Sequence, residues 1–117
     1  MKKEALGTWG ENEALDYLRR KGYRYIDRNV RFKKYEVDLI LEDEYEIVVV
    51  EVKARSTNVM GEPWQAVSKA KQRQIITVAD QYIQRNQIDK NIRFDIVSIV
   101  HNTTQTSIEH IIDAFSA

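Results

Sequence analysis

Residues 35–53 have the sequence YEVDLILEDEYEIVVVEVK and predict two β-strands joined by a tight turn. Apolar and polar residues alternate over Tyr35–Leu41, and Glu46–Lys53 is rich in β-branched residues; both patterns are typical of strands. Ile47–Val50 is apolar at every position, which indicates a strand that is covered on both faces. The segment therefore predicts a hairpin whose second strand lies in the interior of a sheet.

The spacing of the charged residues places two carboxylates side by side in this hairpin. Side chains two residues apart in a strand lie on the same face, so Glu36 shares a face with Asp38. Glu51 shares a face with Lys53 in the same way. With the hairpin centred between residues 44 and 45, Asp38 lies opposite Glu51. The same register places Glu36 opposite Lys53. Directly opposed Cβ atoms are about 4.5–5.5 Å apart, and like charges at that distance destabilise a sheet.

Three arrangements would relieve the repulsion between Asp38 and Glu51. One carboxyl group could keep its proton, Lys53 could lie between the two, or a divalent cation could bind both. Only the cation also gives a reason for the acidic residues, and oxygen ligands favour Mg²⁺ or Mn²⁺. The alternative is a solvated hairpin flank in which Glu36 and Lys53 form an ordinary cross-strand ion pair.

A cation held by Asp38 and Glu51 would suit the hydrolysis of a phosphodiester. It would lower the pKa of a bound water, polarise the scissile phosphate and stabilise the leaving oxygen. Lys53 would orient the attacking water or neutralise the developing negative charge. The hairpin thus predicts phosphodiesterase chemistry.

The flanking sequence predicts an α/β fold with a small mixed sheet and the element order α-β-β-β-α-β(β). A first helix ends near Lys21, where Gly22 is placed to terminate it. The other expected elements are a strand over Tyr23–Phe32, a loop over Ala54–Pro63, a helix over Trp64–Arg85, a strand over Ile92–Val100, and a strand over Ser107–Phe115 for which a short helix is the alternative. The helices are expected to pack against the sheet.

The composition is that of one folded, soluble domain. The chain has 117 residues, of which 43% are hydrophobic and 31% charged, so we expect a single domain over residues 1–117. Cysteine is absent, which excludes disulfides, thiol nucleophiles and cysteine-ligated metal sites. The longest apolar run is far shorter than the roughly 18 residues of a membrane span, and the N-terminus has no apolar signal-peptide core. We therefore expect a cytoplasmic protein without a membrane partner.

The formal net charge is zero, but the charges are unevenly distributed. Residues 35–51 contain seven acidic groups and no basic one, whereas basic groups outnumber acidic ones two to one in residues 1–34 and 52–95. An acidic block between two basic ones is consistent with an anion-binding surface around a cation site. The basic residues expected to contact phosphate are Lys33, Lys34, Arg55, Lys71 and Arg73, although each taken singly is more often a solvated charge.

Several short blocks along the chain carry a resemblance to a known family. Glu36-Val37-Asp38 followed by Glu51-Val52-Lys53 resembles the split Asp then Glu-X-Lys signature of the PD-(D/E)XK nuclease superfamily. More closely, the chain resembles the YraN-like family of small bacterial proteins, commonly grouped with archaeal Holliday junction resolvases. The blocks that carry this likeness are Gly7-Thr8-Trp9-Gly10-Glu11, Gly22-Tyr23, Asn29 with Arg31, Glu36-Val37-Asp38-Leu39-Ile40, Val50-Glu51-Val52-Lys53 with Arg55, Ala66-Val67 with Lys71, and Arg93-Phe94-Asp95.

The resemblance implies a restriction-endonuclease-like sheet and a metal-dependent endonuclease that acts on branched or otherwise structured DNA. It implies Asp38 and Glu51 as metal ligands, with the Val52 carbonyl as a further ligand. Lys53 would be the catalytic lysine, and Glu11 an additional acidic residue that a helix supplies near the metal. Junction substrates call for a two-fold symmetric arrangement, so a homodimer is expected.

Several of these assignments have alternatives. Glu11 also completes a capping box with Thr8, in which the glutamate returns a hydrogen bond to the start of a helix. The chain could instead be a non-catalytic nucleic-acid-binding module that uses the same basic residues, or a protein-interaction domain whose charged hairpin is only a surface. Arg93 and Asp95 are expected to form a structural ion pair, and the two histidines have no predicted partner.

Overall fold

The computed structural model describes all 117 residues. Its elements are α1 (Lys3–Arg20), β1 (Arg24–Phe32), β2 (Tyr35–Glu42), β3 (Glu46–Arg55), the short 3₁₀ helix η1 (Pro63–Ala66), α2 (Lys69–Arg85), β4 (Asn91–His101) and β5 (Thr106–Phe115). This order confirms the predicted α/β class, and the last element is a strand as predicted. β3 extends through Arg55, two residues into the predicted loop.

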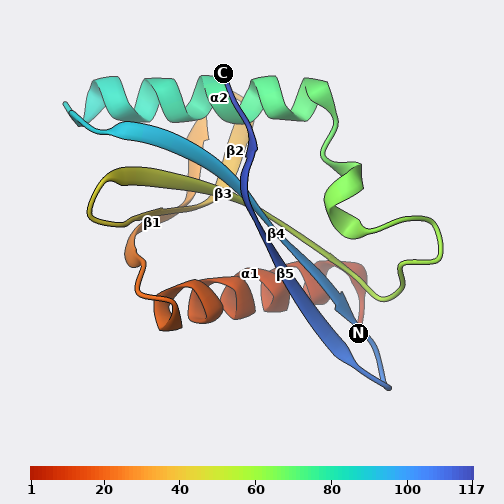
Figure 1. The fold of residues 1–117 in the computed structure, drawn as a ribbon. Helices are drawn as coiled ribbons and strands as arrows, with labels where there is room; N and C mark the ends of the chain where they lie inside the picture. Colours follow the sequence, from red (N-terminus) through yellow and green to blue (C-terminus); the bar gives the residue numbers. More distant parts are fainter.

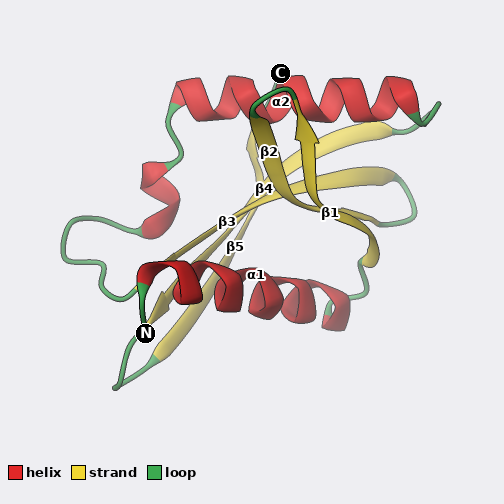
Figure 2. Ribbon diagram, turned by 180° about the vertical axis from the view of Figure 1, so that it is seen from behind, coloured by secondary structure: helices red, strands yellow, loops and turns green.

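Five strands form one sheet in the spatial order β1-β2-β3-β4-β5. β3 and β4 run parallel, and the other neighbouring strands pair in antiparallel fashion. A parallel pair needs a long crossover, which η1 and α2 supply (Figure 1). α1 covers one face of the sheet and α2 the other, as two opposite views show (Figures 1 and 2). Neither helix is long and apolar enough to cross a membrane.

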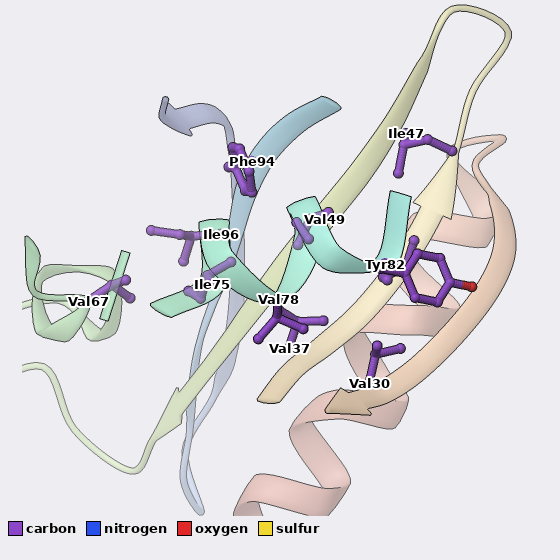
Figure 3. Close-up of a cluster of buried hydrophobic side chains, with 12 residues drawn as sticks. Val30, Val37, Ile47, Val49, Val67, Ile75, Val78, Tyr82, Phe94 and Ile96 are labelled. Atoms are coloured by element: carbon purple, nitrogen blue, oxygen red, sulfur yellow. The ribbon is translucent and has the colours of Figure 1, made fainter. Parts of the chain in front are cut away.

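Two hydrophobic cores lie on the two faces of the sheet. Ile47 and Val49 of β3 join the core beneath α2, which Figure 3 shows in close-up. Val48 and Val50 join the core beneath α1. The uninterrupted apolar run of β3 is thus explained, because every one of its side chains is buried against one helix layer or the other.

The hairpin of β2 and β3 has the predicted register. Leu39 lies opposite Val50, and the pairing continues toward a turn centred between residues 44 and 45. The regular ladder ends at the Leu39–Val50 pair. Asp38 and Glu51 come next along their strands, so they lie at the point where the two strands begin to separate.

Both edge strands of the sheet are irregular. β1 has a bulge between Tyr25 and Asp27, and its Asn29 has a φ of +51°. β5 has extra residues opposite the β4 segment Phe94–Ile96, and its Asp113 has a φ of +56°. A bulge locally bends an edge strand and increases its twist.

The second helix begins later than predicted. We expected a helix over Trp64–Arg85, but α2 starts only at Lys69 after the separate turn η1. Val67 has extended backbone angles, which interrupt the helical path. The Ser68 hydroxyl then caps α2 by accepting a hydrogen bond from the Lys71 N–H (3.1 Å). This cap fixes Lys71 in the first turn of α2.

The first helix ends where the sequence predicts. The Gly22 N–H donates to the Arg19 carbonyl (3.0 Å) and the Tyr23 N–H donates to the Leu18 carbonyl (3.2 Å). These two bonds define a Schellman motif, which requires a left-handed residue at the position after the cap. Gly22 meets that requirement with a φ of +102°.

Gly10 allows α1 to approach β3 closely, and its replacement is our first prediction. A Cβ atom at this position would lie 2.8 Å from the Ala54 Cβ atom. We expect Gly10→Ala to lower the free energy of unfolding by about 1–3 kcal/mol, because overpacking outweighs the gain in helix propensity. Urea unfolding measures the change. Gly7→Ala is the control, since nothing lies within 4 Å of its added Cβ, and it should be neutral or stabilising. Equal stabilities of the two variants would contradict the close approach.

Candidate active site

The structure brings Asp38 and Glu51 together at the end of the β2–β3 ladder. The Asp38 Oδ2 atom accepts a hydrogen bond from the backbone N–H of Val52 (2.7 Å). The charge of Glu51 is, after burial, the largest cause of the raised pKa of Asp38, so the two carboxyl groups lie close to each other. Glu51 is only 4% exposed. These two residues, called the acidic pair below, therefore do not form the solvated hairpin flank that was the alternative interpretation.

Burial dominates the protonation of the acidic pair. Burial, followed by the neighbouring charge of Glu51, raises the pKa of Asp38 to about 8. Burial also raises the pKa of Glu51, although the charges of Lys71 and Lys53 act in the opposite direction. Without a bound cation, the pair therefore retains a proton near neutral pH.

A lysine of α2 forms the ion pair with Glu51. The Lys71 Nζ atom lies 3.7 Å from Glu51 Oε2, whereas Lys53 influences Glu51 only through its charge. The sequence pattern suggested Lys53 as the neutralising residue, because both residues lie on one strand. It gave no sign of Lys71 in this role, since α2 reaches the end of β3 only through the crossover connection.

One oxygen of the acidic pair has no partner. Glu51 Oε1 is buried and forms no hydrogen bond, which is costly for a carboxyl group unless a proton or a cation satisfies it. A divalent cation between Asp38 and Glu51 would use this oxygen, so the residues fit Mg²⁺ or Mn²⁺. No three His, Cys, Asp or Glu side chains converge in a way that could hold an ion. The remaining ligands would therefore be the Val52 carbonyl, water and substrate oxygens.

Glu11 is in the middle of helix α1, and its side chain contacts β1. Its Oε1 atom accepts hydrogen bonds from Asn29 Nδ2 (3.0 Å) and Arg28 Nη2 (3.3 Å). The capping-box interpretation is wrong, because α1 begins well before Thr8 and the helix continues past it. The charge of Glu11 is a minor cause of the raised pKa of Asp38, after burial and Glu51, so Glu11 lies near the acidic pair.

Glu36 pairs with side chains of β1 instead of Lys53. Its carboxylate accepts a hydrogen bond from Arg31 Nε (2.7 Å) and another from Asn29 Nδ2 (3.3 Å). The Glu36–Lys53 ion pair of the alternative interpretation does not form, because the regular β2–β3 ladder ends before it reaches these positions. Asn29 thus bridges Glu11 and Glu36, a link between separate elements that the sequence pattern did not predict.

Of the five basic residues expected to contact phosphate, only Lys71 contacts the acidic pair. Lys33 and Lys34 form the turn between β1 and β2, where each ammonium group lies over a neighbouring aromatic ring (5.4 and 5.8 Å to the centroids). Arg55 is the last residue of β3, and Arg73 lies on the exposed side of α2. These cations are spread over three segments of the chain.

A second buried carboxylate, Asp95 on β4, belongs to a structural network. Arg93 Nε and Nη2 donate to its two oxygens (2.9 and 2.8 Å), which confirms the predicted ion pair. His110 Nε2 lies 2.7 Å from Asp95 Oδ2, and the Asp113 N–H donates to Oδ1 (2.9 Å). Both oxygens of Asp95 are therefore satisfied, in contrast to Glu51 Oε1.

The raised pKa of Asp38 predicts how stability depends on pH. Folded Asp38 holds its proton up to about pH 8, whereas an unfolded aspartate loses it near its ordinary value of 3.8. Between these values the folded chain binds more protons than the unfolded chain, so the stability of the metal-free protein should fall as pH rises. Added Mg²⁺ competes with that proton and should raise the melting temperature more at about pH 8.5 than at about pH 6. Thermal unfolding with excess Mg²⁺ or with chelator measures both effects. A melting temperature that Mg²⁺ does not change at either pH would contradict a cation site.

The fold and the acidic pair define a small α/β protein with two buried carboxylates at the end of a mixed sheet, next to the lysines of β3 and α2. The family model described as "Uncharacterised protein family UPF0102" matches residues 10–99, and the chain belongs to this family. This membership confirms the resemblance to the YraN-like family.

Three relatives illustrate the match over nearly the whole chain. The UPF0102 protein of Christiangramia forsetii is 39% identical over 94% of this chain and 92% of its own length. That of Parabacteroides distasonis is 42% identical over 96% of this chain and 93% of its own. That of Persephonella marina is 42% identical over 93% of this chain and 91% of its own.

Proposed function

We propose that this protein is a metal-dependent endonuclease that hydrolyses phosphodiester bonds in DNA. The observation that carries the proposal is the acidic pair: two adjoining carboxyl groups with raised pKa values, one of which has a buried oxygen without a partner. Carboxylates in this state favour an added cation. The Asp then Glu-X-Lys order at residues 38 and 51–53 supports the same chemistry.

Asp38, Glu51 and the Val52 carbonyl would hold the cation, Mg²⁺ or Mn²⁺. The bound cation would supply Lewis-acid polarisation of the scissile phosphate and stabilise the leaving oxygen. The Val52 N–H fixes the orientation of the Asp38 carboxylate through its 2.7 Å hydrogen bond. Glu11 adds negative charge near the pair, which increases the attraction for a cation.

Lys53 and Lys71 supply positive charge near Glu51. Both lower the pKa of Glu51 against the dominant effect of burial. Lys53 is the catalytic lysine of the proposal: it would orient the attacking water or neutralise the negative charge that develops on the phosphate. Its freedom from any ion pair leaves its ammonium group available for that task.

The proposed substrate is DNA, in branched or otherwise structured form. Lys33, Lys34, Arg55, Lys71 and Arg73 would contact its phosphates, which position a duplex without reading its sequence. A homodimer would match the symmetry of a junction substrate.

Cleavage assays test the proposal directly. Duplex, nicked, flapped and four-way DNA are incubated with the protein in Mg²⁺, Mn²⁺ or chelator. We expect cation-dependent cuts that Asp38→Ala and Lys53→Ala each reduce by about 10²-fold or more, because the first removes a ligand and the second a charge at the reacting phosphate. Glu109→Ala, at an exposed position of β5, is the control and should cleave like the wild type.

A non-catalytic nucleic-acid-binding module is the second candidate. It is favoured by the convergence of only two acidic ligands, with no third His, Cys, Asp or Glu completing the set. Salt-sensitive DNA binding that neither Asp38→Ala nor Lys53→Ala changes, without cleavage in any cation, would establish the module in place of the enzyme. Absence of binding to every DNA would exclude both.

A further inference from the structure

A hollow of about 530 Å³ lies between the start of α1 and the loop that follows β3. Lys3, Lys53 and Arg55 line it, and none of the three forms an ion pair. No acidic side chain lines the hollow, so its electrostatic field attracts anions. Lys53 also lies two residues from Glu51, and the hollow therefore begins directly beside the candidate active site.

The hollow also has apolar lining residues. Met60, Met1 and the buried Leu6 are among them. Met60 and its neighbour Val59 are 90% and 83% exposed, so two apolar side chains stand in solvent at the tip of the loop. Figure 1 shows this loop, in green between β3 and η1, extending away from the sheet near the N-terminus.

The loop is anchored at both ends, and at its start Asn102 Nδ2 donates to the Ser56 carbonyl (2.9 Å). The Trp64 N–H donates to the Ser98 hydroxyl of β4 (3.1 Å), which fixes η1 to the sheet. Within the loop, Asn58 Nδ2 donates to Glu62 (3.0 Å), and the Gly61 N–H donates to the Asn58 carbonyl (3.0 Å). Hydrogen bonds within the loop therefore fix the position of its exposed apolar tip.

We infer that this hollow binds one unpaired nucleotide of the nucleic acid, next to the phosphodiester at the acidic pair. The inference rests on the proposed function and names the feature of the substrate that the site selects. Lys3 and Arg55 face the phosphate, and Met60 with Leu6 faces the base. The volume lies within the range of about 300–1,000 Å³ that is usual for small-ligand sites.

The combination of charge and apolar surface favours an unpaired nucleotide over a paired one. A paired base is stacked on its neighbours, so its faces are not available to the Met60 side chain. An unstacked base exposes those faces, and apolar side chains at protein–DNA interfaces contact or wedge such bases. The cations next to Met60 place the adjoining phosphate within reach of the same hollow.

The test is a binding measurement in chelator, where no cleavage occurs. Fluorescence anisotropy compares a blunt duplex with the same duplex carrying a one-nucleotide bulge. We expect the wild type to bind the bulged DNA about tenfold more tightly, because the unstacked base gains contact with the apolar residues of the hollow. Met60→Ser should reduce this preference to about twofold or less while leaving duplex binding unchanged. Arg55→Gln should weaken binding to both DNAs. It should also reduce the slope of the logarithm of the binding constant against the logarithm of the salt concentration by about one, because one fewer counterion is released.

Tyr45→Ser is the matched control, because Tyr45 is a similarly exposed apolar residue at the opposite end of β3. It should retain the full preference for bulged DNA. Equal binding of the two DNAs by the wild type would overturn the inference, as would a preference that survives both Met60→Ser and Val59→Ser. Met60-dependent binding to phosphatidylserine vesicles, without a preference between the DNAs, would overturn it by assigning the tip to a lipid surface.

The outcome is separable from that of the proposed function. A preference for bulged DNA without cation-dependent cleavage would retain the nucleotide site and reject the nuclease. Cleavage of duplex and bulged DNA at equal rates, with equal binding, would retain the nuclease and reject the nucleotide site.

Discussion

Asp38→Asn should stabilise the metal-free protein at about pH 8.5 and abolish its response to Mg²⁺. Burial and the charge of Glu51 raise the pKa of Asp38 to about 8, so above that pH the folded chain must hold two ionised carboxylates side by side. An asparagine removes one of these charges, and its side-chain oxygen can still accept the hydrogen bond from the Val52 N–H. We expect a gain in the free energy of unfolding on the order of 3 kcal/mol. The same substitution removes a cation ligand, so Mg²⁺ should no longer bind and should no longer change the melting temperature.

Urea unfolding in chelator, and melting temperatures with and without Mg²⁺, measure the two effects. The gain should shrink as the pH falls below about 8, because wild-type Asp38 is then itself neutral. Asp16→Asn is the control, since Asp16 forms an exposed pair with Arg20 on α1 and should change stability little. A variant that is less stable than the wild type at high pH, or that still responds to Mg²⁺, would rule out the acidic pair as a strained cation site.

Asp95→Ala should destabilise the fold more than any surface substitution, by about 3–5 kcal/mol. Asp95 is fully buried, and its removal would leave Arg93, only 13% exposed on its side chain, without its bidentate partner. Burial alone would raise the pKa of Asp95, but hydrogen bonds from His110 and Arg93 outweigh burial and lower it. The carboxylate thus contributes stability above the ordinary pKa of 3.8 that is lost as the pH falls through the lower folded value.

Urea unfolding near pH 7 measures the loss in Asp95→Ala. Asp16→Ala, which breaks an exposed pair on α1, should cost at most about 1 kcal/mol. The double variant Arg93→Leu with Asp95→Leu should recover part of the loss, because it leaves no buried charge unpaired. A single variant as stable as the wild type would show that the network contributes nothing to the fold.

The β2–β3 hairpin and its interior position in the sheet followed from local patterns in the sequence. Ile47–Val50 is apolar on both faces, and it lies in the central strand with one helix on each side. A short turn centred between residues 44 and 45 determines which residues of β2 and β3 lie opposite each other, and it brings Asp38 next to Glu51. These features depend on residues within one hairpin, where period and turn length leave few alternatives.

The contacts that complete the site could not be read from local patterns. Lys71 reaches Glu51 because Val67 and Ser68 delay the start of α2, and the helical pattern alone extended the helix back to Trp64. The capping motif at Glu11 was misleading because the residues before Thr8 are themselves helical. His110 also had no predicted partner, since its contact with Asp95 depends on the bulged pairing of β4 with β5.

The bulges in β1 and β5 bear on how copies of this chain can assemble. An edge strand with an even row of N–H and C=O groups invites another chain to extend the sheet, which leads to fibres and strand-exchanged aggregates. Here the bulge between Tyr25 and Asp27 in β1, and the extra β5 residues around Asp113, interrupt those rows on the two outermost strands. Growth of the sheet from molecule to molecule is therefore disfavoured at both borders. Two copies working on one symmetric DNA would have to meet through their helices or loops.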